Sequence, residues 1–138
     1  MQRFALVFFI CLVCAMNAQA VLVLGYAYLS GQSEHENIRV IFEAVSPSAE
    51  TDTTYTSIYG AFSATLQPGV YNVLYSFAGY ADYRLPNQIL LWNTALDPVT
   101  LLPPLSGYLS GSLGPGDFQV TDSIVVATGQ SLTIQPGT

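Results

Sequence analysis

A regular alternation of apolar and polar residues is the feature that most limits what this chain can fold into. In the segment IRVIFEA, every second residue from Ile38 to Ala44 is apolar, and Arg39 and Glu43 lie between them. A period of two is typical of a strand that buries one face. After residue 20, no segment shows the longer period of an amphipathic helix. The sequence therefore predicts an all-β protein.

Turn and loop residues divide the chain into several such strands. Polar stretches predict loops at 31–37 and 46–53, and strand-like segments cover residues 21–30, 38–44, 55–66, 71–77, 89–92 and 99–102. Gln67-Pro68-Gly69-Val70 fits a type II turn, since proline fixes φ at the second position and glycine accepts a positive φ at the third. We therefore expect residues 71–77 to form the second arm of a hairpin.

The first twenty residues predict an export signal rather than part of the fold. Arg3 precedes an apolar run from Phe4 to Met16, and Ala18-Gln19-Ala20 provides a small-x-small cleavage site. This pattern is typical of a secretory leader, and the run is too short to span a membrane core about 30 Å thick. Cys11 and Cys14 leave with the leader, so the mature chain is expected to be secreted and held without disulfides.

Composition excludes several classes of function. The chain has 9 acidic residues against 3 basic ones, and a net charge of −6. Because no basic patch exists to displace counterions from phosphates, nucleic acid is not an expected partner.

All three basic residues are arginines, so lysine-dependent Schiff-base chemistry and Lys–Asn isopeptide bonds are excluded. Charged residues are only 9% of the chain, against roughly a quarter in typical globular domains, which fits an extracellular β protein.

The segment after Pro103-Pro104 changes character. Two consecutive prolines favour an extended segment, and beyond them short apolar runs alternate with glycine-containing turns. We therefore expect a signal peptide at 1–20, a β-sandwich at 21–102, a Pro-rich linker at 103–106 and the start of a second β domain at 107–138. The chain stops on a turn after SLTI, so we expect it to be a piece of a longer protein.

Residues 25–80 resemble the carboxypeptidase regulatory-like domain, a transthyretin-like β-sandwich of secreted proteins. The resemblance rests on four pieces in order: Gly25 opening the first strand, IRVIFEA, residues 56–62 with Gly60 ahead of the aromatic Phe62, and LQPGVYNVLYSFAGY. It implies an immunoglobulin/transthyretin-like sandwich without catalytic residues, used as a spacer, stabiliser or adhesive unit. Residues 105–138 resemble the entry to a right-handed parallel β-helix of exported bacterial proteins.

The candidate catalytic and metal-binding residues all have simpler interpretations. His35 is the only histidine, and with Glu34 and Glu36 it could approach a metal. Metal sites need three or four converging ligands, however, and consecutive loop residues alternate in direction. We therefore interpret these three as solvated loop residues and expect no resident metal. Calcium could bind loop acids such as Asp52 or Asp122, but the sequence around them contains no calcium-binding loop motif.

Hydrolase chemistry has little support in the sequence. Glu43 and Asp82 are a conceivable pair of glycosidase carboxylates, but Glu43 shares its strand face with Arg39, which favours a surface ion pair or solvation. The mature chain has no cysteine and no Gly-x-Ser-x-Gly motif, and one histidine is its only candidate base. We expect no catalytic residues, no cofactor and no enzymatic activity.

Aromatic residues raise the alternative of a carbohydrate-binding module. Tyr71, Tyr75 and Phe77 share the apolar face of their strand with Val73, so we expect them in the core. The remaining candidates for stacking against sugar rings are Tyr26, Tyr28, Tyr80, Tyr83 and Trp92, of which Trp92, Tyr80 and Tyr83 are the preferred glycan contacts.

The function expected from the sequence is that of a secreted, structural or adhesive β-sandwich module at a cell surface. Its predicted partners are downstream domains of the same polypeptide, with extracellular polysaccharide or a cell-surface protein as further candidates. The predicted core comprises Val40, Phe42, Phe62, Leu66, Tyr71, Val73 and Tyr75.

Overall fold

The structure is a computed structural model that describes residues 19–138, so the predicted leader lies outside the described residues except for its last two positions. Every regular element of the described part is a β-strand. Within residues 19–138, no helix is long and apolar enough to cross a membrane. The all-β class predicted from the sequence is confirmed.

The first sheet is built around β1 (Val21–Leu29), which lies at its centre. On one side, β1 pairs antiparallel with β4 (Ala61–Leu66). On the other side, two short strands follow one another along its length: β7 (Thr94–Ala95) and β8 (Val99–Leu101), both parallel to β1. The backbone of β1 is therefore hydrogen-bonded on both sides.

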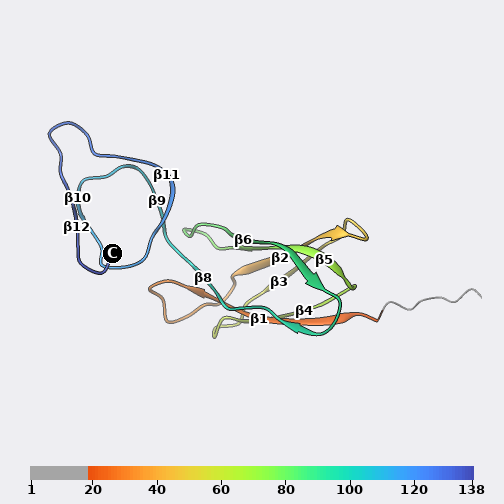
Figure 1. Cartoon of the computed structure of the whole chain (residues 1–138). Coiled ribbons are helices and arrows are strands. Elements are labelled where there is room, and N and C mark those ends of the chain that lie inside the picture. Colours follow the sequence, from red (N-terminus) through yellow and green to blue (C-terminus); the bar gives the residue numbers. More distant parts are fainter. Residues whose placement is uncertain (1–18) are drawn as a thin grey trace, which may run out of the picture.

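The second sheet has the order β3-β2-β5-β6 and is antiparallel throughout. Its strands are β2 (Arg39–Ser46), β3 (Thr51–Tyr55), β5 (Gly69–Ser76) and β6 (Tyr83–Leu90). The two sheets lie face to face, as Figure 1 shows. The fold is thus a β-sandwich.

Aromatic side chains from both sheets meet in the core between them. Phe62 of the first sheet lies 6.4 Å from Phe42 and 5.9 Å from Tyr75 of the second, measured between ring centroids. Gly25 leaves room for this packing, because a Cβ at that position would overlap the Phe62 ring. All seven predicted core residues are buried: Val40, Phe42, Phe62, Leu66, Tyr71, Val73 and Tyr75. Phe77 is half-buried against their edge.

The hairpin expected at Pro68-Gly69 is wrong. β4 pairs with β1 and β5 pairs with β2 and β6, so this turn carries the chain from one sheet to the other. Gly69 also lacks the positive φ of a type II turn. Glycine is required at position 69 for a different reason, because a Cβ there would overlap the carbonyl oxygen of Ser46. Alternation within each strand does not reveal whether successive strands share a sheet.

Several strand boundaries also differ from expectation. The strand expected at 89–92 is the end of β6, which runs from Tyr83 to Leu90. Residues 51–53, expected in a loop, begin β3, whose exposed Thr51 and Thr53 suit an edge strand that faces water. Residues 57–60 form a turn rather than part of one long strand, with Gly60 at a φ of 79°. The expected linker at 103–106 is mostly strand, because β9 begins at Pro104.

The C-terminal segment winds into a coil of parallel strands. β9 (Pro104–Tyr108) pairs in parallel with β11 (Gln119–Val125), and β10 (Gly111–Leu113) pairs in parallel with β12 (Leu132–Ile134). The chain therefore passes twice over the same path, and the second pass lies beside the first (Figure 1). We call residues 103–138 the C-terminal coil.

Candidate functional site

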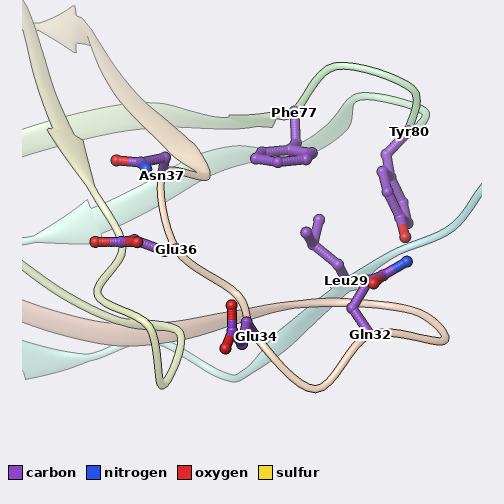
Figure 2. A pocket seen from close by; sticks show the side chains of 7 residues that line it. All are labelled: Leu29, Gln32, Glu34, Glu36, Asn37, Phe77 and Tyr80. Carbon is purple, nitrogen blue, oxygen red and sulfur yellow. The ribbon is translucent and has the colours of Figure 1, made fainter.

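Loops at one end of the sandwich surround an open hollow of about 430 Å³. Figure 2 shows the rings of Phe77 and Tyr80 on one side of it and Leu29 with Gln32 on the other. The Tyr80 hydroxyl donates a hydrogen bond to the Ser30 carbonyl oxygen at 2.9 Å, and its ring packs edgewise on Phe77 at 5.9 Å. The aromatic wall of the hollow is thus fixed by the loop opposite.

The only histidine takes part in the structure of this loop. The Nδ1 atom of His35 accepts a hydrogen bond from the backbone N–H of Leu29 at 3.0 Å. Its ring also lies edgewise against Tyr28, with ring centroids 5.0 Å apart at 77°. Glu34 and Glu36 are exposed as expected, but the half-buried His35 is not simply solvated. The sequence pattern does not indicate this structural role of His35, because the role depends on contacts with Leu29 and Tyr28 across the loop.

Thr56 is the buried polar residue that holds the His35 loop in place. Its hydroxyl donates to the carbonyl oxygen of His35 and accepts from the backbone N–H of Ile38 at 2.9 Å. Its own backbone carbonyl accepts from Asn37 at 3.0 Å. One threonine therefore satisfies three backbone groups just before β2, of which the Ile38 amide is buried, and this fixes the position of the loop.

The acids proposed for chemistry are engaged elsewhere or exposed. Of the surface ion pair and the solvation that the sequence left open for Glu43, the structure has an ion pair, at 2.6 Å, with Arg84 on β6 instead of Arg39. Asp82 is exposed. Asp52 and Asp122 each accept a hydrogen bond from the next backbone N–H. Within residues 19–138, no three His, Cys, Asp or Glu side chains converge to hold a metal ion.

Two core tyrosines have hydroxyl groups whose pKa is raised. Burial, with a smaller contribution from Tyr83, raises the pKa of the Tyr75 hydroxyl well above 10.0. Burial and the nearby carboxylates of Glu50 and Asp52 also raise the pKa of Tyr71. The Tyr71 hydroxyl donates to the Gln67 carbonyl oxygen at 2.7 Å. Both groups stay neutral in the fold, which suits a structural role rather than proton transfer.

The preferred glycan contacts do not form one site. Trp92 is exposed beside the first residues of β1, where it lines a separate hollow. Tyr80 lies at the other end of β1, whose nine residues span about 26 Å. Tyr83, at the start of β6, lies 6.4 Å from Tyr75 between ring centroids. A single short ligand therefore does not reach Trp92 and Tyr80 together.

The outer face of β1 carries a continuous row of apolar side chains, whereas the aromatic residues named above lie apart from one another. Leu22, Leu24, Tyr26 and Tyr28 all point away from the core, since Val21, Val23, Ala27 and Leu29 are buried. The two tyrosines were among the candidates predicted from the sequence, but the leucines were not. Because both faces of VLVLGYAYL are apolar, the pattern alone does not show which face is exposed.

Comparison with known proteins assigns the chain to no family. No family model matches it, and no curated protein matches it. It is similar to a chain in each of two crystal structures of type II cohesin–X-dockerin complexes from Acetivibrio cellulolyticus, one an N-terminal and one a C-terminal interface mutant. Sequence identities are 17% and 18%, with a TM-score of 0.49 in each case. Each match covers 60% of this chain and 58% of the other, so the chain spans little more than half the length of those chains.

Proposed function

We propose that this chain is a non-enzymatic structural module of an exported protein, in which the sandwich holds the C-terminal coil in a fixed position. The observation that carries the proposal is the direct passage from the sandwich core into the coil. Leu101, the last residue of β8, is buried in the core. The coil begins two residues later, where Gln119 donates a backbone hydrogen bond to Pro103 at 2.9 Å.

Backbone hydrogen bonds fix this passage from two directions. Ser30, just after β1, donates to the Leu101 carbonyl oxygen at 3.0 Å. Ala81, between β5 and β6, donates to the Leu102 carbonyl oxygen at 2.9 Å. Loops from both sheets therefore hold the exit strand, and no unpaired stretch remains between Leu102 and the coil. This arrangement supports a spacer that sets the direction of the coil.

The engagement of the polar groups supports a structural rather than catalytic role. His35 uses its Nδ1 atom to accept the Leu29 amide, and the Glu43 carboxylate is paired with Arg84. The leader-like residues 1–20 support export, with action outside the cell or at its surface.

The proposed family is the carboxypeptidase regulatory-like domain. The four sequence pieces behind that resemblance fall on β1, on β2, on the turn before β4 and on β5.

The experiment compares the coil with and without its sandwich. Amide hydrogen exchange is followed by NMR in residues 19–138 and in a synthetic peptide of residues 103–138, with residues 19–102 as the control for sandwich folding. The peptide is expected to exchange freely, because so short a segment buries too little apolar surface to fold alone. In the longer chain, the amides of Leu109, Gly111 and Gln135 are expected to be protected, since each is hydrogen-bonded across the coil. Equal protection in the isolated peptide would contradict the anchoring role.

A further inference from the structure

The outer face of β1 carries a row of four apolar side chains in line. Leu22, Leu24 and Tyr26 are 41%, 46% and 47% exposed, and Tyr28 is half-buried beside them. At 3.3 Å per residue, the row is about 20 Å long. We call these four residues the β1 ridge.

The neighbours of the β1 ridge are small and uncharged. On β4, the paired residues are Ala61, Ser63 and Thr65; on β7 and β8, they are Ala95 and Thr100. In a sheet, directly paired residues point to the same face. The side chains of the β1 ridge therefore project further from the sheet than the small methyl and hydroxyl groups on either side. A ligand lying along it meets no charge from the strands on either side.

The aromatic end of the ridge is fixed before any ligand arrives. A Cβ on Gly60 would lie 3.1 Å from two atoms of the Tyr28 ring, so the ring rests against this glycine. His35 packs on the ring edgewise, and Tyr26 lies nearly parallel to it, 6.2 Å away at 15°. Gly60 is itself held by a hydrogen bond from the Ala27 amide at 2.9 Å. Rings fixed in this way lose little entropy on binding.

An added peptide strand does not suit this surface. Strand addition uses the free backbone groups of a sheet edge. β1 lies in the middle of its sheet, with β4 on one side and β7 and β8 on the other. A peptide on the ridge would leave its own backbone groups without partners from β1.

A second copy of the chain is also a poor fit. A stable protein interface needs about 800 Å² from each partner. Four side chains of which less than half is exposed offer at most roughly 400 Å², taking 150–250 Å² as the full area of an aromatic residue. Each copy also carries a net charge of −6, which opposes association.

A neutral polysaccharide chain meets every feature of the surface. It is linear and narrow, its C–H faces pack on aromatic and aliphatic side chains, and its hydroxyls match those of Tyr26, Ser63 and Thr65. The acidic balance of the protein disfavours an anionic polysaccharide. We propose that the β1 ridge binds a neutral polysaccharide lying along β1. The site is independent of the coil-holding role, and it would attach the module to a glycan surface.

Calorimetric titration of the whole chain with neutral hexasaccharides tests the proposal. The probes are cellohexaose, xylohexaose, mannohexaose and maltohexaose, with a polygalacturonate fragment as the anionic comparison. Saturable binding of at least one neutral probe is expected, with no binding of the anionic one. Tyr28→Ala and Tyr26→Ala are expected to weaken that binding at least about tenfold. Tyr108→Ala, which removes an exposed tyrosine of the coil, is the matched control and leaves the affinity unchanged.

Three results would overturn the proposal. The first is the absence of saturable binding to every neutral probe by the folded protein, as judged from its NMR spectrum. The second is unchanged affinity in both tyrosine variants. The third is a dimer in sedimentation equilibrium that Leu24→Ser abolishes, which would make the ridge a protein interface. Tyr28→Phe keeps the ring and retains most of the affinity, which separates stacking from loss of the fold.

His35 is a positioning residue in this scheme, and its effect is measurable on Tyr28. His35→Ala removes the edgewise ring contact and is expected to shift the NMR signals of the Tyr28 ring and to weaken binding a few-fold. Leu29, which donates to His35, stays in place as part of the core. If the Tyr28 signals and the affinity both stay unchanged, His35 does not orient the ring.

Discussion

The sandwich and the C-terminal coil place their apolar residues in opposite ways. In the sandwich, Phe42 and Tyr75 are completely buried between the two sheets. In the second pass of the coil, Val120 and Ile134 are 61% and 64% exposed, although each is paired with an apolar residue of the first pass, Val120 with Leu105 and Ile134 with Leu113.

The difference arises from how each region is closed. Two facing sheets cover each other, so an aromatic core is sealed from both sides. Within residues 19–138, the two parallel passes of the coil cover each other only along one edge, so the second pass keeps an open side. We infer that, in residues 19–138, the free energy of unfolding comes almost entirely from the sandwich and that the coil depends on it.

The largest expected effect is the loss of an aromatic ring from the sandwich. Phe42→Ala is expected to lower the free energy of unfolding by about 3–5 kcal/mol, because it leaves a cavity in the core. Phe118→Ala, which removes a half-buried ring from the coil, is the matched variant and should cost less than about 1 kcal/mol. Urea denaturation followed by circular dichroism measures both. Equal losses would contradict the division between the two regions.

A smaller loss is expected from the buried threonine that holds the His35 loop. Thr56→Val keeps the shape but leaves the Ile38 amide and the His35 carbonyl without their partner. The expected cost is about 1–3 kcal/mol. Thr54→Val on the neighbouring edge strand is the control, with no expected loss. A Thr56→Val protein as stable as the parent would show that this network does not support the sandwich.

Tyr75 offers a gain in stability rather than a loss. Its hydroxyl is buried and has no hydrogen-bond partner within residues 19–138. Tyr75→Phe removes that unpaired group and is expected to raise the free energy of unfolding by about 1 kcal/mol. Thermal denaturation near neutral pH measures the change, and a loss of stability would mean that the hydroxyl contributes to packing.

The same residue predicts how the sandwich responds to alkali. Because burial raises the Tyr75 pKa above the 10.0 of an unfolded tyrosine, only the unfolded chain gains from ionisation when the pH first exceeds 10. Stability is therefore complete below pH 10 and falls above it, by up to about 1.4 kcal/mol per pH unit for this group. The fall should be shallower in Tyr75→Phe. Equal slopes in both proteins would assign the alkaline loss to other groups.

The smallest expected effect is at the surface of the second sheet. Glu43 and Arg84 form an exposed ion pair at 2.6 Å, and such pairs contribute about 0–1 kcal/mol. Glu43→Gln is expected to change the free energy of unfolding by less than about 0.5 kcal/mol at moderate salt. Urea denaturation with and without added salt checks this. A loss as large as that of Phe42→Ala would show that surface charge, not the core, sets the stability.

Much of the sandwich was predictable because its strands alternate cleanly. The alternation in residues 38–44 indicated the buried face of β2, and the tyrosines at 71 and 75 were correctly placed in the core. The turn at Pro68-Gly69 was not, because strand pairing is a long-range property. A Pro-Gly turn is compatible both with a hairpin and with a connection between two sheets.

The candidate site was less predictable than the fold. The importance of His35 depends on Leu29, Tyr28 and Thr56, which are distant in sequence or belong to no motif. The β1 ridge was hidden because both faces of β1 are apolar, and only the packing of the second sheet decides which face is covered. Glycan contact by Trp92, Tyr80 or Tyr83 stays a prediction, although these three residues do not share one surface.

The most direct test of the division between sandwich and coil is native-state hydrogen exchange of the whole chain in low concentrations of denaturant. We predict that amides of β2 and β5 exchange only through global unfolding. Amides of β11 and β12 should exchange through local opening at a much smaller free energy. If the coil amides exchanged with the same free energy as the sandwich amides, the two regions would unfold as one unit, and the dependence of the coil on the sandwich would be contradicted.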